Sequence, residues 1–237
     1  MSLVGAHRAE QVLDAWAGNR RRAVILDFNG TLSDDEWILR EIFAEMFLEE
    51  LGWTLTEQEY RTELLGRSDR EILETVVARH RGQDPELVDR MLTRRRNRYQ
   101  EIVAGRSPIT SEATRFLRRL KAAHVPVAVV TGAERADVTA VLDDSEAGRL
   151  VDLVVTAEDV RRGKPDPEGF FRGAGLMGRL PEDVLVFEDS LPGVHGAGRA
   201  GMRCIAVTRE PAPPGLSEAA DATIGSLSPD ILACLPL

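Results

Sequence analysis

The chain has few residues that could crosslink it. Its 237 residues include only two cysteines, Cys204 and Cys234. Two are too few for a disulfide framework, and neither has a neighbouring histidine that would indicate a catalytic thiol. We therefore expect both to pack as small apolar side chains. Their scarcity is typical of a protein of the reducing cytoplasm.

Long apolar runs and positive charge are also lacking. No run approaches the roughly 20 apolar residues that span a bilayer, and residues 1–18 lack the basic region and apolar core of a signal peptide. We therefore expect a cytoplasmic protein with no membrane partner. The net charge is −9 and the pI about 5.1, which excludes non-specific nucleic-acid binding because that requires a positive surface.

Lysine is scarce even among the basic residues. Of the 30 basic residues only Lys121 and Lys164 are lysines, and the others are arginines. Because arginine serves wherever positive charge alone is needed, a lysine retained against this bias is a candidate for a role that arginine cannot fill.

The most informative segment that is present begins at residue 23. The apolar run Ala-Val-Ile-Leu ends at Asp27 and is followed by Asn29, Gly30 and Thr31. Such a run predicts a strand buried on both faces. Because ligands bind at the carboxyl ends of strands in open α/β sheets, Asp27 is a candidate nucleophile, metal ligand or both. The alternative is a carboxylate that only caps a turn.

The remaining periodicity divides the chain into two kinds of segment. A helix is expected at residues 6–17, and residues 34–106 are helical throughout. From residue 111 onward helices alternate with buried strands, which indicates a parallel sheet with crossover helices. We predict an α/β protein with a Rossmann-like parallel sheet. Its core domain comprises residues 1–33 and 107–237, and residues 34–106 form an inserted α-helical cap domain. The later strands are expected at 125–130, 151–155, 184–187 and 204–207.

Polar residues follow the strands at one predicted edge of this sheet. They are Asp27 and Asn29, Thr131 and Gly132, Lys164, and Glu188 and Asp189. Clustered carboxylates without histidine favour a hard cation, usually Mg²⁺. A lysine, a threonine and helix-start amides suit a phosphate group. A carboxylate nucleophile beside both describes phosphoryl transfer through an aspartyl-phosphate.

These motifs, in this order, resemble the haloacid dehalogenase (HAD) superfamily of aspartate-nucleophile phosphohydrolases. The matching segments are residues 27–32, 130–132, 163–167 and 187–190, with Gly193 and residues 201–202. The helical segment resembles the α-helical cap of the branch that includes phosphoglycolate phosphatase and β-phosphoglucomutase. Residues 65–72 resemble the cap loop of that branch, which reaches the substrate.

The resemblance implies a role for each matched residue. Asp27 attacks phosphorus, and Lys164 neutralises the nucleophile and the developing charge. Mg²⁺ is held by Asp27, the backbone carbonyl of Asn29, and Asp189, with Glu188 close by. Phosphate oxygens are bound by Thr131 and the Gly132 amide, and Gly66 and Arg67 contact the substrate. The expected partner is a small phosphorylated metabolite, and the expected state is a monomer or weak dimer.

The match fails two residues after the nucleophile, where family phosphatases usually carry an acid/base Asp. Here the residue is Asn29, and an amide cannot donate and then withdraw a proton. Three explanations stay open. The substrate can have a good leaving group, such as an acyl phosphate; another carboxyl can substitute, with Asp34, Asp35 and Glu36 near in sequence; or the protein binds phosphorylated ligands with little turnover.

Two neighbouring activities fit the residues less well. The mutases of this branch typically place a histidine twelve residues after the nucleophile, where this chain has Leu39. A β-phosphoglucomutase-like mutase is therefore only a weak alternative. Phosphonate hydrolysis uses a cap lysine, and residues 34–106 contain none. The basic run at residues 94–98 either faces an anionic substrate or forms a solvated helix face.

Overall fold

A six-stranded parallel sheet forms the centre of the protein, which we describe from a computed structural model for residues 3–208, 212–233 and 235. The strand order is β3-β2-β1-β4-β5-β6, and all neighbours are parallel. The predicted α/β class and Rossmann-like sheet are confirmed. The strands are β1 (Ala23–Leu26), β2 (Val127–Val130), β3 (Leu153–Val155), β4 (Val184–Glu188), β5 (Arg203–Val207) and β6 (Ala222–Ile224).

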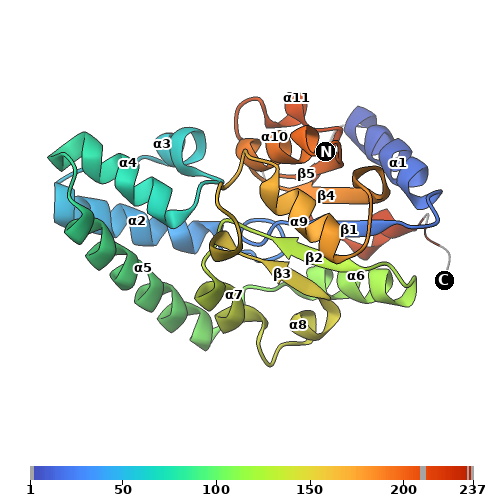
Figure 1. Cartoon of the computed structure of the whole chain (residues 1–237), viewed down its shortest axis with the longest axis horizontal. Coiled ribbons are helices and arrows are strands. Elements are labelled where there is room, and N and C mark those ends of the chain that lie inside the picture. Colours follow the sequence, from blue (N-terminus) through green and yellow to red (C-terminus); the bar gives the residue numbers. More distant parts are fainter. Residues whose placement is uncertain (1–2, 209–211, 234, 236–237) are drawn as a thin grey trace.

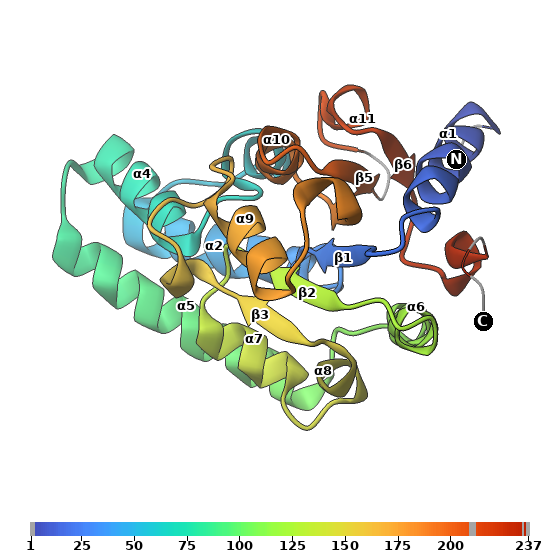
Figure 2. The ribbon, with the colours of Figure 1, turned by 45° about the vertical axis from the view of Figure 1, so that its right-hand side comes forward.

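Helices cover both faces of this sheet (Figures 1 and 2). Side chains alternate along β1, so Val24 and Leu26 pack on one face and Ala23 and Ile25 on the other. The first face is covered by α1 (Leu3–Ala17), α6 (Ser111–Ala122), α7 (Arg135–Leu142) and α8 (Glu146–Leu150). The second is covered by α9 (Glu168–Leu176), α10 (Leu191–Arg199) and α11 (Leu216–Ala219).

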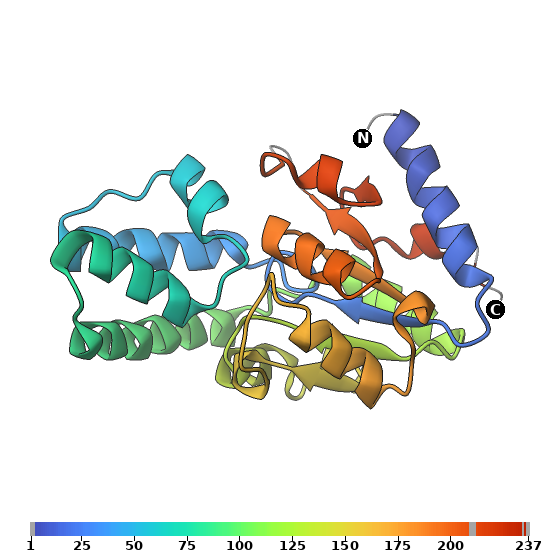
Figure 3. The same ribbon diagram turned by 45° about the horizontal axis from the view of Figure 1, so that its top comes forward.

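The helical insertion, which we define as residues 36–105, lies beside the sheet at the end to which β1 points (Figure 3). Its helix ends carry side-chain caps and a left-handed glycine. Thr56 and Ser68 each form a capping box, Asp84 caps the last helix, and Gly52 ends the first in the left-handed conformation. Its elements are α2 (Glu36–Leu51), α3 (Glu57–Glu59), the π-helix η1 (Tyr60–Leu64), α4 (Asp69–Arg81) and α5 (Pro85–Gly105).

The rest of the chain also follows the sequence pattern with small shifts. The tail carries a short strand, β6, and a 3₁₀ turn, η4 (Pro229–Leu232). Two other 3₁₀ turns are η2 (Ala157–Asp159) and η3 (Pro181–Asp183). Cys204 is buried in β5 as expected, whereas Cys234 lies outside the described residues. Within the described part of the chain, no helix combines the length and apolarity needed to cross a bilayer.

The basic run of α5 contains a buried arginine that fits neither alternative considered for it. Arg95 is 1% exposed. Its Nε lies 3.0 Å from Asp69 Oδ2 of α4, its Nη1 pairs with Asp137 of α7, and its guanidinium lies 5.0 Å from the centre of the Tyr99 ring. Arg94, by contrast, is an exposed partner of glutamates on α2. Arg95 therefore joins the helical insertion to α7.

We expect Arg95→Ala to destabilise the protein strongly, because it leaves two carboxylates buried without a counter-charge. Loss of one partner from a buried ion pair costs about 3–5 kcal/mol, which corresponds to a fall in Tm of roughly 6–20 °C for a chain of this size. The matched control is Arg94→Ala, whose exposed pairs contribute at most about 1 kcal/mol. Thermal unfolding followed by circular dichroism checks this, and equal Tm values for the two variants would contradict it.

Candidate functional site

Asp27 lies where β1 ends, at the middle of the sheet edge. Its backbone N–H donates to Phe187 O of β4 at 2.9 Å, and its side chain is only 7% exposed. The chain then turns sharply through Gly30, whose φ of +75° is readily adopted by glycine. The predicted placement of Asp27 at a strand end is what the backbone shows.

Lys164 lies directly against this carboxylate. Its Nζ contacts Asp27 Oδ1 and lies 2.5 Å from Glu188 Oε1, and it is 5.6 Å from the centre of the Phe170 ring. Burial opposes the charge, but the two carboxylates outweigh it and raise the pKa of Lys164. The other lysine, Lys121, pairs with Asp152 at the surface. Of the two lysines that the composition singled out, Lys164 is thus the one that contacts Asp27, the candidate nucleophile.

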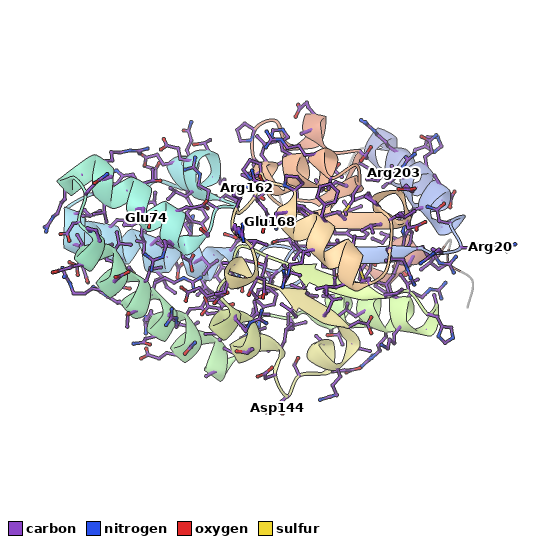
Figure 4. The ribbon with its side chains drawn as sticks, in the orientation of Figure 1. Arg20, Glu74, Asp144, Arg162, Glu168 and Arg203 are labelled. Atoms are coloured by element: carbon purple, nitrogen blue, oxygen red, sulfur yellow. The ribbon has the colours of Figure 1, made fainter. Side chains whose placement is uncertain are left out.

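The loop that carries Lys164 is held by a side chain at the start of the helix that follows it. The carboxylate of Glu168, at the start of α9, accepts hydrogen bonds from the backbone N–H groups of Arg161 and Arg162 at 3.0 and 3.2 Å. Figure 4 shows Glu168 and Arg162 near the junction of the sheet and the helical insertion. These bonds brace the turn from which Lys164 reaches Asp27.

Glu188 ends β4 and has no exposed surface. Besides Lys164, it accepts hydrogen bonds from the backbone N–H and the hydroxyl of Ser190, both at 2.8 Å. Gly193, in the first turn of α10, leaves the space it needs, since a Cβ there would lie 1.8 Å from Glu188 Oε1. Glu188 therefore links Lys164 to the start of α10.

Asp189 completes a group of three acidic side chains. A Cβ on Gly30 would lie 2.1 Å from Asp189 Oδ2, and the Thr31 hydroxyl donates to Oδ1 at 3.4 Å. Burial, reinforced by Glu188 and other carboxylates nearby, raises the pKa of Asp189 well above its usual range. Burial likewise raises the pKa of Asp27 to about 7, although Lys164 opposes the shift.

This group fits a divalent cation. Carboxylate oxygens of Asp27, Glu188 and Asp189 all lie within 4.8 Å of one another. Two buried carboxylates and one partly buried carboxylate face one lysine, so their charge is not balanced, and the donors are all oxygen. Such a set suits Mg²⁺, and a bound cation would lower the pKa values that burial raises. That the Asn29 backbone carbonyl is a further ligand stays a prediction.

The side-chain amide of Asn29 is hydrogen-bonded to the carboxylate of Asp35. Its Nδ2 donates to Asp35 Oδ2 at 2.9 Å, and Ser33 Oγ donates to the same oxygen at 2.6 Å. The hydroxyl of Tyr99 on α5 donates there too. Asp35, one of three carboxyls considered as replacements for the usual acid, therefore has its Oδ2 occupied by three donors.

Glu36 is the second of these carboxyls, and it faces the site. The Tyr60 hydroxyl donates to Glu36 Oε2 at 2.6 Å, and Gly30 is adjacent, since a Cβ there would lie 2.8 Å from Glu36 Cγ. Burial, reinforced by nearby carboxylates including Asp27, raises the pKa of Glu36 to about 8. The contribution of Tyr60 had no signal in the sequence.

A cavity of about 40 Å³ lies between these groups. All the residues predicted for the site line it except Glu188, which lies behind Lys164. The cavity is bounded by Asp27, Asn29, Thr131, Gly132, Lys164 and Asp189 from the sheet, and by Glu36, Leu39, Phe43, Tyr60, Leu64, Gly66, Arg67, Asp69 and Ile72 from the helical insertion, with Ala133. Asp69 belongs to the predicted cap loop at residues 65–72, whereas Tyr60 lines the cavity without having been predicted.

Residues 66–69 form the loop that closes the cavity. Gly66 has a φ of +83°, and a Cβ there would lie 2.4 Å from Ser190 Oγ. A Cβ on Gly132 would lie 3.6 Å from the backbone nitrogen of Ser68. The loop therefore lies against both Gly132 and the start of α10. Arg67 also borders a groove of about 720 Å³, which shares Arg67 and Lys164 with the cavity.

Comparison with known proteins agrees with this geometry. A protein-family model described as haloacid dehalogenase-like hydrolase matches residues 21–201. Validoxylamine A 7'-phosphate phosphatase of Streptomyces hygroscopicus subsp. limoneus is 31% identical over 84% of this chain and 91% of its own. Protein CbbY of Rhodobacter capsulatus is 29% identical over 91% of this chain and 97% of its own.

Solved structures give the same result. CbbY from Rhodobacter sphaeroides, in complex with phosphate, superposes with a TM-score of 0.74 at 26% identity, over 91% of this chain and 99% of that one. A β-phosphoglucomutase from Clostridium difficile shares the fold, with a TM-score of 0.75 at 18% identity over 87% of this chain and 91% of that one. The family model spans most of the chain and includes every strand-end motif, so the protein belongs to the haloacid dehalogenase-like hydrolases.

Proposed function

We propose that this protein is a Mg²⁺-dependent phosphatase that hydrolyses a small phosphorylated metabolite through an aspartyl-phosphate at Asp27. The observation that carries the proposal is the contact of Lys164 with Asp27 inside a cavity that Thr131, Gly132 and Asp189 also line. Phosphatases among the relatives support the reaction class. The groove beside Arg67 suits the rest of a polar substrate.

The proposed reaction has two displacements at phosphorus. An Asp27 oxygen forms a bond to phosphorus while the bond to the leaving oxygen breaks, and the alcohol departs. Water then attacks phosphorus, the bond to Asp27 breaks, and inorganic phosphate leaves. Lys164, the Thr131 hydroxyl and the Gly132 amide stabilise the charge on the phosphoryl oxygens. Mg²⁺, when bound, supplies further positive charge at these oxygens.

We assign the binding of Mg²⁺ to Asp27, Asp189 and the backbone carbonyl of Asn29, with Glu188 close by. Glu188 already bonds to Lys164 and Ser190, so its first contribution is to hold Lys164 against the nucleophile. Removing the metal removes charge stabilisation that a single lysine does not replace, because three carboxylates remain, two of them buried.

The leaving alcohol needs a proton that Asn29 cannot give. Of the three carboxyls close in sequence, Asp35 is engaged by Asn29 and Ser33, whereas Glu36 lines the cavity. We therefore assign the acid role to Glu36, with Tyr60 holding one of its oxygens at 2.6 Å. Once it has protonated the alcohol, the ionised Glu36 takes up the proton that the attacking water loses. A binding protein with little turnover is the second candidate, because the amide at Asn29 favours it. A mutase fits less well, since Leu39 lines the cavity.

Residues 34–106 act in this proposal as a cap domain. The cavity of about 40 Å³ is close to the roughly 30 Å³ that one water occupies in the liquid. A phosphorylated metabolite therefore enters only when residues 66–69 move away from Ser190 and Gly132. Arg67 and the groove beside it would then receive the part of the substrate that is not phosphate.

Activity should depend on Asp27 and Lys164 but not on the other lysine. We expect Asp27→Ala and Lys164→Met to lower kcat/KM by at least about 10³-fold, because removing a nucleophile or its charge partner removes interactions made in the transition state. The matched control is Lys121→Met, which should stay within about twofold.

The assay is phosphate release with Mg²⁺ from a panel of p-nitrophenyl phosphate, acyl phosphates, sugar phosphates and sugar bisphosphates. Sugar derivatives are included because a relative is named a phosphorylated carbohydrates phosphatase and a solved CbbY structure contains xylulose-1,5-bisphosphate. No turnover of any compound would reject the hydrolase in favour of the binding protein.

Glu36→Gln should slow hydrolysis according to the leaving group. Loss of an acid costs about 10²–10⁴-fold where the leaving group needs a proton, so alkyl phosphates should be affected by that amount. p-Nitrophenyl phosphate should lose less than about tenfold. Glu41→Gln, on the exposed side of the same helix, is the control. Equal losses on both substrates would show that Glu36 is not the acid.

Mg²⁺ should stabilise the protein more at pH 8 than at pH 6. Asp27 and Glu36 have raised pKa values, about 7 and 8, and that of Asp189 is also raised. Their contribution to the free energy of unfolding is present at low pH and is lost as pH rises through 7 to 8. Mg²⁺ binds the ionised forms, so its effect has the opposite pH dependence.

At about 100 times its Kd, Mg²⁺ should raise Tm by roughly 5–10 °C at pH 8 and by clearly less at pH 6. Differential scanning fluorimetry after EDTA treatment measures this shift. Asp189→Asn serves as the control and should lose most of the shift at both pH values. A shift of equal size at the two pH values in the unmodified protein would speak against a metal on these carboxylates.

A further inference from the structure

Asp35 is a buried carboxylate with an unusual set of partners. It has no exposed surface. It occupies the N-cap position of α2, yet its side chain makes no capping bond to that helix. Instead Oδ2 accepts from Asn29 Nδ2, Ser33 Oγ and the Tyr99 hydroxyl. Because a buried charge is costly unless it is fully hydrogen-bonded, this arrangement needs a reason other than helix capping.

The bond to Asn29 determines which end of that side chain reaches the cavity. An amide group is planar, with its N–H donors and its carbonyl oxygen on opposite sides of Cγ. Nδ2 is turned toward Asp35, 2.9 Å away, whereas Asn29 itself lines the cavity beside Asp27. The carbonyl oxygen is therefore the end available to a substrate or a water.

We propose that Asp35 is a positioning residue that holds the Asn29 side chain with its carbonyl oxygen toward Asp27. This inference rests on the proposed function, in which a water attacks phosphorus. Asn29 accepts a hydrogen bond from that water and fixes its direction of attack. It takes up no proton, because an amide oxygen orients a donor without becoming a base at neutral pH.

The same pair accounts for the amide at position 29. An aspartate there would place a second carboxylate about 2.9 Å from the buried carboxylate of Asp35, and like charges this close cannot both stay ionised. Asparagine satisfies Asp35 with a donor and still presents an oxygen to the cavity. Asn29 and Asp35 therefore form one unit, and neither is explained without the other.

The central test is a double-mutant cycle on kcat with p-nitrophenyl phosphate and Mg²⁺. Misplacing a positioned group by about an ångström can cost about 10²-fold, so Asp35→Ala and Asn29→Ala should each lower kcat by about 10–100-fold, with KM changed by less than about threefold. The double variant should be no slower than Asn29→Ala alone. Ser33→Ala, which removes another donor to Asp35 Oδ2, is the matched control and should keep kcat within about threefold.

Two outcomes would overturn the proposal. One is a full loss from Asp35→Ala in the Asn29→Ala background, which would show that Asp35 acts independently of Asn29. The other is a kcat for Asp35→Ala like that of Ser33→Ala. Asp35→Asn supplies a conservative rescue, because its carbonyl oxygen can still accept the bond from Asn29, and it should recover most of the lost kcat.

A measurement on the unmodified protein stays valid if the Asp35 variants do not fold or if no substrate is turned over. The side-chain NH₂ signals of Asn29, identified by their absence in Asn29→Ala, should show one proton protected from exchange with solvent. The exposed Asn97 gives the unprotected reference. Exchange of both Asn29 protons as fast as those of Asn97 would reject the Asn29–Asp35 bond, whereas lack of turnover alone would reject the proposed function and leave the bond standing.

Discussion

The repulsion among buried carboxylates at one sheet edge is the constraint around which this protein is built. Asp27, Glu188 and Asp189 come from the ends of β1 and β4, which are neighbours in the sheet. A parallel sheet brings such ends together whatever their charge. Lys164 offsets part of the repulsion, whereas burial, with a smaller contribution from neighbouring carboxylates, raises the pKa values of Asp27 and Asp189. Proton uptake or a bound cation relieves the rest.

Much of the surrounding structure serves to hold that one lysine in place. Glu168 braces its loop, Glu188 contacts it from behind, and Gly193 provides the space that Glu188 fills. An arginine has a wider, planar head group than lysine, and the space between Asp27 and Glu188 is occupied by a single Nζ. The presence of a lysine at residue 164, in a chain whose basic residues are almost all arginines, thus has a local explanation.

The sheet and the strand-end residues were predictable because their signals are local. Polar residues follow the apolar runs, and a parallel sheet carries those residues to one edge. The sequence alone therefore groups Asp27, Thr131, Lys164 and Asp189. The capping boxes at Thr56 and Ser68 are also local, because each joins two residues that are three positions apart.

Contacts between distant segments were not predictable. Nothing in the sequence around Tyr99 indicates that its hydroxyl reaches Asp35, 64 residues earlier. The run at residues 94–98 shows why. Its arginines are alike in sequence, and only the direction in which each side chain leaves α5 decides whether it is solvated or buried. Glu36 could be named as one of three nearby carboxyls, but only the cavity distinguishes it from Asp35.

The pairing of Arg95 has a consequence for how the molecule comes apart. Its guanidinium joins Asp69 at the cavity to Asp137 on the helix beside the sheet. Pulling the helical insertion from the sheet would break both of these buried ion pairs at once. The insertion and the sheet should therefore unfold in one cooperative transition rather than in two separate ones.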